Sequence, residues 1–466
     1  MAALPVIAII DVGKTNKKLF LFDEQYRIVY ERSGQFIETT DEDGDSCENL
    51  ESLRLFVYDS LHEVLRRKEF AIKAINFSTY GASFVYIDED GRPVTPLYNY
   101  LKPYPEALKQ QFYHKYGGEE TVSLQTASPV LGSLNSGMQL YRLKKESPEV
   151  FGRIRYALHL PQYMSYILSG AAYTDITSIG CHTNLWDFTR NDYHHWVKSE
   201  GLLEKLAPVV PSNTVVPSLF SINGLKVGVG LHDSSAALIP YLVNFEEPFV
   251  LLSTGTWCIS LNPFNDQPLT AGELKQDCLC YLTFQGKPVK ASRLFAGQQH
   301  EDLVRRIAAH FGQSPQRYRS MAFQPRFVEA LLQFFNLNTD GPTSYLAQVP
   351  SFDQLDLSSF PSDEEAYHHL IFNLVVQQYA STSFVLKGSS VKKIFVDGGF
   401  SKNTIFMNLL ASVFPGIEVF AASVAQATAI GTALSIHSHW NNQPTPSNLI
   451  ELKRFFALNY SLSETK

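Results

Sequence analysis

The sequence predicts an α/β protein made of two related domains that face one cleft. The chain has 466 residues, more than one ordinary hydrophobic core holds. Apolar strands alternate with amphipathic helices in both halves of the chain. Each half also opens with the same design, in which a turn of glycine and hydroxyl residues joins two apolar strands. We expect the domains to comprise residues 1–244 and 245–466.

Composition narrows the classes of partner. Apolar residues make up 45% of the chain and charged residues 18%, which is typical of a globular protein. The formal charge of −7 and the absence of long Lys or Arg runs argue against a nucleic-acid partner. The apolar start, Met1–Ile10, lacks the basic lead-in of a signal peptide, and no apolar run has the length of a membrane span. We expect a cytoplasmic protein without a membrane partner, and a homodimer stays open.

Five cysteines, at positions 47, 181, 258, 278 and 280, show no paired spacing of zinc ligands. Cys278 and Cys280 fit two thiols of one strand better than a metal site. We expect the cysteines to be reduced, as in the cytosol.

The first strand, Pro5–Ile10, ends at Asp11, and a second strand follows at Lys18–Asp23. The intervening turn contains Gly13 and can cradle phosphate oxygens with its backbone N–H groups, although a plain hairpin with a polar tip has the same pattern. A carboxylate at the end of a buried strand is costly unless it binds a donor or a cation. Asp11 is therefore a candidate partner of a magnesium ion, acting through a water molecule.

The middle of the chain contains a strand that runs into Gly228 and Gly230, with Asp233 at the start of an Ala-rich helix. The acid then lies at a strand-to-helix corner. One interpretation is a helix cap, shared with Ser234 and Ser235. The other is a functional carboxylate, and the phosphate-type turns elsewhere in the chain favour it.

Other elements of the first half are expected as helices over 50–67, 133–146 and 161–168 and as strands over 71–78 and 84–87. A segment rich in Tyr and Pro, residues 93–104, is typical of a small-molecule pocket wall, although packing gives the same pattern equally often.

The second half opens with the strand Phe249–Leu252, the turn Ser253–Thr256 and the strand Trp257–Leu261. A long helix is expected over 363–386. The strand 393–396 then leads into the glycine turn Asp397–Asn403 and another helix. These glycines allow a ligand to approach the backbone, and the helix N-terminus favours an anion or a polar ring.

Taken together, these motifs and their order resemble the FGGY family of carbohydrate kinases, in the actin-like, hexokinase-like ATPase superfamily. The block Gly230-Leu-His232-Asp233-Ser-Ser-Ala-Ala is the specific part, whereas the glycine turns alone are common. The resemblance rests on residues 11–18, 230–237, 253–257, 397–403 and 427–431.

The resemblance implies two ribonuclease-H-like domains around a central catalytic cleft, the first binding a small sugar or polyol and the second most of the ATP. It implies Asp233 as the general base and a magnesium ion between Asp11 and Asp233. The implied nucleotide-binding residues are Gly13, Lys14, Thr15, Lys18, Thr254, Gly255, Thr256, Gly398, Gly399 and Asn403. The implied acceptor-binding residues are Tyr80, Gly81, Tyr100, His232 and Asp233.

Four departures from the family pattern concern mainly the acceptor. Lys14 replaces a small hydroxyl residue and places an extra positive charge near the phosphates. Tyr80-Gly81 replaces Gln-Gly, Gln426 replaces an acid, and the segment Tyr100–Tyr104 lacks the usual acid and Arg. The turn 253–257 and the His-Asp block resemble the rhamnulokinase and fuculokinase branch, so we expect an L-6-deoxyketose as substrate. The alternatives are a kinase for a xylulose-type ketose or a polyol, and a catalytically idle sensor.

Overall fold

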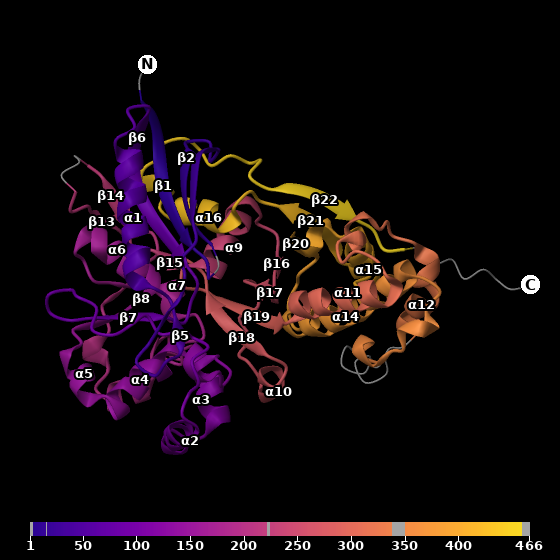
Figure 1. The fold of residues 1–466 in the computed structure, drawn as a ribbon, viewed down its shortest axis with the longest axis horizontal. Coiled ribbons are helices and arrows are strands. Elements are labelled where there is room, and N and C mark those ends of the chain that lie inside the picture. Colours follow the sequence, from indigo (N-terminus) through magenta and orange to yellow (C-terminus); the bar gives the residue numbers. More distant parts are fainter. Residues whose placement is uncertain (1–2, 15, 221–223, 338–349, 459–466) are drawn as a thin grey trace, which may run out of the picture.

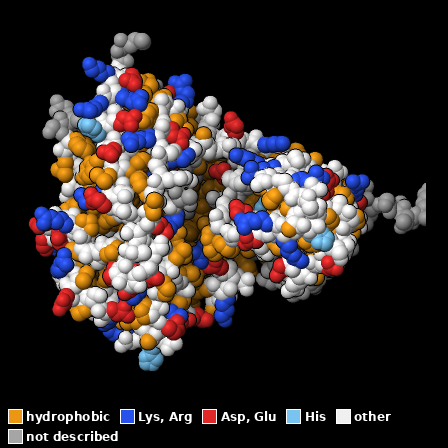
Figure 2. All heavy atoms as spheres, in the orientation of Figure 1, with side chains coloured by type: hydrophobic (Ala, Val, Ile, Leu, Met, Phe, Trp, Pro, Cys, Tyr) orange, Lys and Arg blue, Asp and Glu red, His pale blue; other side chains and the backbone are white. Residues whose placement is uncertain are grey.

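The computed structural model describes residues 3–14, 16–220, 224–337 and 350–458. Two lobes follow one another along the chain, and each is built around one mixed seven-stranded sheet (Figure 1). The space-filling view shows a groove between the lobes with apolar side chains on its walls (Figure 2).

The first sheet has the strand order β13-β14-β6-β1-β2-β3, with β15 pairing to β6. Strand β1 pairs antiparallel to β2 and parallel to β6, and β6 pairs parallel to β14 and β15. The bounds are β1 Leu4–Val12, β2 Lys17–Asp23, β3 Ile28–Gly34, β6 Phe70–Thr79, β13 Val215–Pro217, β14 Lys226–Gly228 and β15 Leu231–His232.

The second sheet has the order β18-β19-β17-β16-β20-β21-β22. Strand β16 pairs antiparallel to β17 and parallel to β20, and β20 pairs parallel to β21. The bounds are β16 Phe249–Thr254, β17 Cys258–Asn262, β18 Cys278–Leu282, β19 Pro288–Leu294, β20 Lys393–Gly398, β21 Glu418–Ser423 and β22 Glu451–Phe455.

The two sheets share one pairing scheme. The series β3-β2-β1-β6-β14 and β19-β17-β16-β20-β21 both start with two antiparallel pairs and continue with two parallel pairs. A first strand followed by a hairpin and then by parallel crossovers is the same topology used twice. The predicted fold class, two related α/β domains of ribonuclease-H-like type, is therefore confirmed.

Helices cover the faces of both sheets (Figure 1). The larger helices are α1 Leu50–Leu65, α2 Glu106–Lys115, α3 Glu119–Thr126, α4 Ser136–Glu146, α6 Leu160–Ser169, α9 Asp233–Asn244, α11 Ala296–Phe311, α12 Glu329–Leu337, α14 Asp363–Leu386, α15 Thr404–Val413 and α16 Ala427–Ser435. The shorter ones are α5 Pro148–Arg153, α7 Ile176–Ile179, α8 His195–Ser199 and α10 Ala271–Leu274. Short strands occur at β4 Thr39–Thr40, β5 Ser46–Cys47, β7 Phe84–Ile87, β8 Tyr156–His159, β9 Thr174–Asp175, β10 Trp186–Asp187, β11 Asp192–Tyr193 and β12 Val209–Val210.

Most predicted elements lie within a few residues of the observed ones. The helix over 363–386 has the predicted bounds, because Ser362 caps it and Glu365 N–H donates to the Ser362 hydroxyl. The helix expected over 133–146 begins only at Ser136, after a 3-10 turn at 132–134. The strand before Asp233 is interrupted, because Gly230 adopts a φ of 79° between β14 and β15.

All five cysteines are buried and free, and Cys278 and Cys280 both lie on β18. Among the described residues, no helix combines the length and apolar character needed to cross a bilayer. The division of the chain at residues 244 and 245 stays a prediction.

One helix of the C-terminal half packs against the N-terminal half. Helix α16 crosses α9 so closely that a Cβ on Gly431 would lie 1.8 Å from the Ala236 carbonyl oxygen. The buried Asn76 amide of β6 donates to the Thr432 carbonyl at 3.1 Å and to the Ser435 hydroxyl at 3.2 Å. This packing fixes α9, and with it Asp233, relative to both sheets.

Replacing Gly431 by Ala should therefore destabilise the protein. The added methyl group collides with backbone, which cannot move aside as a flexible side chain can, so we expect a loss of about 1–3 kcal/mol in the free energy of unfolding. Urea unfolding measures this change. The matched control is Gly152→Ala in α5, where a Cβ meets nothing within 4 Å and stability should hold or rise. Equal stability of both variants would contradict the close packing of α9 and α16.

Candidate active site

Asp11 lies at the carboxyl end of β1, next to the centre of the first sheet. In the β1–β6 register it is opposite Ser78, whose hydroxyl donates to Asp11 Oδ1 at 2.8 Å. Burial raises the pKa of Asp11 to about 6, the Ser78 hydrogen bond opposes this rise, and the negative charge of Asp233 adds to it. The two carboxylates are thus close enough to repel one another.

Asp233 is the first residue of α9, directly after the short strand β15. Its Oδ1 accepts hydrogen bonds from the Ser234 N–H at 2.6 Å and the Ser234 hydroxyl at 3.2 Å, and no side-chain cap bond is made at the start of this helix. Burial raises the pKa of Asp233 to about 6, although 33% of its side chain is exposed. Asp233 therefore lies within the first turn of α9 and not at its N-cap position, and a third of its side chain stays exposed.

His232 lies beside this acid and is buried. Its Nε2 atom is 3.2 Å from Asp233 Oδ1 and 3.1 Å from Cys181 Sγ. Burial lowers the pKa of His232 to about 3, so the ring is neutral. A Cβ on Gly81 would lie 2.7 Å from Cys181 Sγ and 3.1 Å from the His232 ring, so Gly81 allows this close approach.

The first glycine turn is closed by a hydrogen bond from Gly13 N–H to the Asn16 carbonyl at 2.9 Å. Lys14 Nζ lies 3.0 Å from Glu38 Oε1, and Lys18 Nζ donates to Glu31 Oε1 at 2.9 Å. Both ammonium groups thus have carboxylate partners, and their contact with phosphate stays a prediction. Thr15 lies outside the described residues.

Tyr80, Tyr100 and Lys14 form one group on the N-terminal side of the site. The Tyr80 and Tyr100 rings meet edge to face at 5.8 Å, and Lys14 Nζ lies 5.8 Å and 5.7 Å from their centroids. Burial, followed by the charge of Asp233, raises the pKa of Tyr100. The structure therefore brings Tyr80 and Tyr100 together and places Tyr100 within electrostatic range of Asp233.

A cavity of about 320 Å³ lies on the C-terminal side. Its lining joins four segments that are separate in the sequence: the hairpin turn at 254–256, the glycine turn at 399–403, the start of α11 and a 3-10 turn at 317–320. The lining residues include Thr254, Gly255, Thr256, Gly297, His300, Tyr318, Gly399, Phe400 and Asn403. Five of the ten predicted nucleotide residues therefore line one cavity.

The glycine turn at 397–403 is hydrogen-bonded to Thr254 of the hairpin turn at 253–256. Gly399 N–H donates to the Thr254 carbonyl at 2.8 Å, and Phe400 N–H donates to the Thr254 hydroxyl at 3.0 Å. Gly398 has a φ of 90°, and a Cβ there would lie 2.0 Å from the Thr254 carbonyl oxygen. Asn403 Oδ1 accepts from the N–H groups of Ile405 and Phe406, so this side chain caps α15.

Sequence reasoning missed part of this cavity wall. Gly297 approaches the hairpin closely, since a Cβ there would lie 1.9 Å from the Gly255 carbonyl oxygen. His300 contributes a ring that is neutral because burial lowers its pKa to about 4, and its Nε2 lies 2.9 Å from the Tyr367 hydroxyl. The Ala-Gly pair at the start of an amphipathic helix was the available signal for Gly297, and no local signal points to His300 or Tyr318.

The donor set fits a hydrated divalent cation. Asp11 and Asp233 repel each other and are costly to ionise when buried, which a nearby cation would offset. Among the described residues no cluster of three or more His, Cys, Asp or Glu side chains converges on a metal position. A magnesium ion here would take its remaining ligands from water and from ATP phosphates, as this ion commonly does.

Comparison with known proteins shows the family of the chain. Residues 6–239 match the model of the N-terminal domain of the FGGY family of carbohydrate kinases, and residues 246–444 match the model of an FGGY C-terminal domain. A rhamnulokinase of Mannheimia succiniciproducens is 22% identical over 454 residues, which cover 91% of this chain and 88% of that protein.

Solved structures show the same fold. A carbohydrate kinase from Novosphingobium aromaticivorans matches with a TM-score of 0.78 and 24% identity, over 98% of this chain and 95% of that chain. A xylulose kinase from Lactobacillus acidophilus matches with a TM-score of 0.75 and 17% identity, over 97% and 94%. By its two matched domain models, the chain belongs to the FGGY family of ATP-dependent carbohydrate kinases.

Proposed function

We propose that this kinase transfers the γ-phosphoryl group of ATP to the primary hydroxyl of an L-6-deoxyketose, such as L-rhamnulose or L-fuculose, and forms the 1-phosphate. The observation that carries the kinase part of this proposal is the partly exposed Asp233 carboxylate, at a strand-to-helix corner within electrostatic range of Asp11. The His-Asp block and the similarity to a rhamnulokinase support this acceptor class.

Asp233 is proposed as the general base that takes the proton of the acceptor hydroxyl. The raised pKa near 6 makes it a stronger base than an exposed carboxylate while it stays mostly ionised at neutral pH. Phosphoryl transfer otherwise needs mainly positioning and neutralisation of charge. Tyr80, Gly81, Tyr100 and His232 are proposed to contact the acceptor.

The nucleotide is proposed to bind on the opposite side of the cleft. The turns at Gly13 and Gly255 would hold its phosphates with backbone N–H groups, and the turn at Gly398 and Gly399 would approach the adenosine. The cavity of about 320 Å³ supports the second part of this assignment. A magnesium ion between Asp11 and Asp233 would neutralise phosphate charge.

The alternatives to this assignment differ in whether they need a general base. A kinase for a xylulose-type ketose or a polyol would use the same base and hairpins, and the structural match to a xylulose kinase fits this alternative. A sensor of the same fold would have no need of a base at Asp233.

A panel of acceptors tests the proposal. We expect ADP release from ATP and magnesium with an L-6-deoxyketose, and a fall in kcat of about 10²–10⁴-fold in Asp233→Ala with nucleotide affinity largely kept. Release with another ketose or a polyol would replace the acceptor assignment. Full activity of Asp233→Ala would remove Asp233 as the base, and no acceptor-dependent release from folded protein would favour a sensor.

The magnesium role of Asp11 is tested by Asp11→Asn. The amide keeps the shape of the side chain but removes the negative charge, so half-maximal activity should require several-fold more magnesium. The measurement is the initial rate against magnesium concentration at saturating ATP and acceptor. An unchanged magnesium requirement would exclude Asp11 as a partner of the ion.

A further inference from the structure

We propose that Lys102 is a positioning residue: it anchors the turn that carries Tyr100 to an acidic hairpin and so places Tyr100 at the acceptor site. The acidic hairpin comprises residues 38–48 and contains β4 and β5. This inference rests on the proposed function only in assigning Tyr100 to the acceptor side of the cleft.

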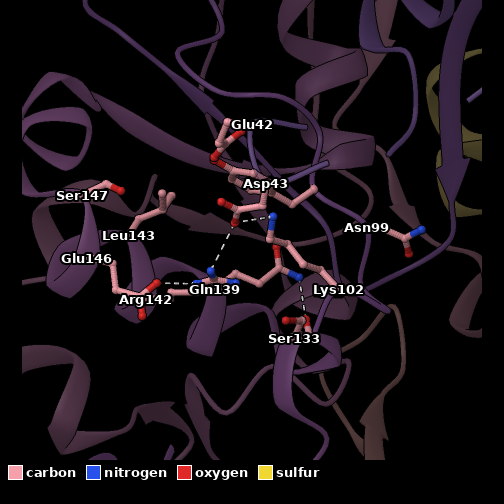
Figure 3. Close-up of a pocket in the computed structure, with 11 residues that line it drawn as sticks. Glu42, Asp43, Asn99, Lys102, Ser133, Gln139, Arg142, Leu143, Glu146 and Ser147 are labelled. Carbon is pink, nitrogen blue, oxygen red and sulfur yellow. Dashed lines mark hydrogen bonds and ion pairs between the residues drawn. The ribbon is translucent and has the colours of Figure 1, made fainter. Parts of the chain in front are cut away.

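The Lys102 ammonium group is saturated by carboxylates. Its Nζ lies 2.8 Å from Asp43 Oδ2 and 3.2 Å from Asp45 Oδ2, and it also donates to Asp41. An ammonium group has three N–H donors, and three carboxylates surround this one. With 9% of the residue exposed, Lys102 has no donor left for a sugar hydroxyl. Figure 3 shows its amine pointing at Asp43, away from Asn99.

The tip of the acidic hairpin is folded around the Lys102 ammonium group. Asp41 Oδ1 accepts from the backbone N–H groups of Asp43 and Asp45, both at 3.0 Å, and the Asp41 side chain is fully buried. A buried carboxylate is strongly unfavourable without a cation, and the two more exposed carboxylates nearby add to the negative charge that Lys102 offsets. Lys102 therefore supplies the positive charge on which the conformation of the acidic hairpin depends.

A second contact holds the other end of the same turn. The Tyr98 hydroxyl donates to Glu42, and Lys102 N–H donates to the Asn99 carbonyl at 3.0 Å. The turn 98–102 is thus attached to the acidic hairpin at both of its ends. Tyr100 is the central residue of this turn.

The acidic hairpin also contacts Tyr80 of the proposed acceptor site and Lys14 of the first glycine turn. Glu38 pairs with Lys14 at 3.0 Å, and Glu48 pairs with Lys17 and accepts from the Tyr80 hydroxyl. One acidic segment therefore holds the first glycine turn, Tyr80 and the Tyr100 turn in a fixed arrangement. The segment 100–104 lacks the acid and the Arg of the family pattern. The contacts of the acidic hairpin hold this segment in place instead.

Lys102→Ala tests the proposal. Lys102 lies in the Tyr100 turn itself and reaches the first glycine turn only indirectly, through Glu38 of the acidic hairpin. We therefore expect the acceptor KM to rise about tenfold, and the ATP KM and kcat to change less, by at most about threefold. Added propylammonium should fill the space left by the side chain and restore the acceptor KM, whereas tetramethylammonium at the same concentration should not.

Lys145→Met is the matched control. Its ammonium lies 3.1 Å from Glu200, a carboxylate that keeps Lys115 and Lys144 as partners, so this variant loses one of several cations around a buried acid. The acceptor KM should stay unchanged. An acceptor KM that is unchanged in folded Lys102→Ala, or raised equally by Lys145→Met, would overturn the proposal.

Two further measurements keep the proposal testable. If Lys102→Ala does not fold, Tyr98→Phe removes only the hydroxyl that donates to Glu42, and an unchanged acceptor KM in that variant would overturn the proposal. Hydrogen exchange of residues 98–102 needs no acceptor and should be faster in Lys102→Ala and slowed again by propylammonium. If the proposed function is wrong, the wild-type protein itself will not transfer phosphate to L-6-deoxyketoses. Failure of the Lys102 proposal would be seen only in the variants.

Discussion

The parallel pairing of β6 with both β1 and β15 is the constraint on which the site depends. At the level of Ser78 and Thr79, Asp11 lies on one side of β6 and His232 on the other. Asp233 follows directly, so two carboxylates from distant parts of the sequence meet at one sheet edge. Strand ends of parallel pairs face the same direction, which makes this edge the natural place for a ligand.

The buried carboxylates at this edge of the sheet determine which ligands it favours. Burial raises the pKa of both Asp11 and Asp233 to about 6, and their mutual repulsion favours a cation between them. On the N-terminal side, by contrast, the lysines are already neutralised: Lys14, Lys17 and Lys102 all pair with acids of residues 38–48. The proposed acceptor side is thus preorganised by internal ion pairs.

Local sequence patterns predicted those features of the structure that depend only on neighbouring residues. The two hairpins, the capped helix at 363–386 and the corner at Asp233 each follow from a few consecutive residues. The contacts of the lysines were not predictable, because Glu38, Asp41 and Glu48 approach them only through the tertiary fold. The packing of Gly431 on Ala236 and the places of His300 and Tyr318 in the cavity likewise depend on contacts between segments distant in the sequence.

The most direct measurement is the single-turnover rate of Asp233→Asn, taken together with its urea unfolding midpoint. Asparagine keeps an oxygen that accepts from the Ser234 N–H but cannot take a proton at neutral pH. If Asp233 is the general base, the transfer rate should be about 10²–10⁴-fold lower at an unfolding midpoint close to that of the wild type. A nearly normal rate with a lowered midpoint would contradict it, because Asp233 would then serve the helix and not the reaction.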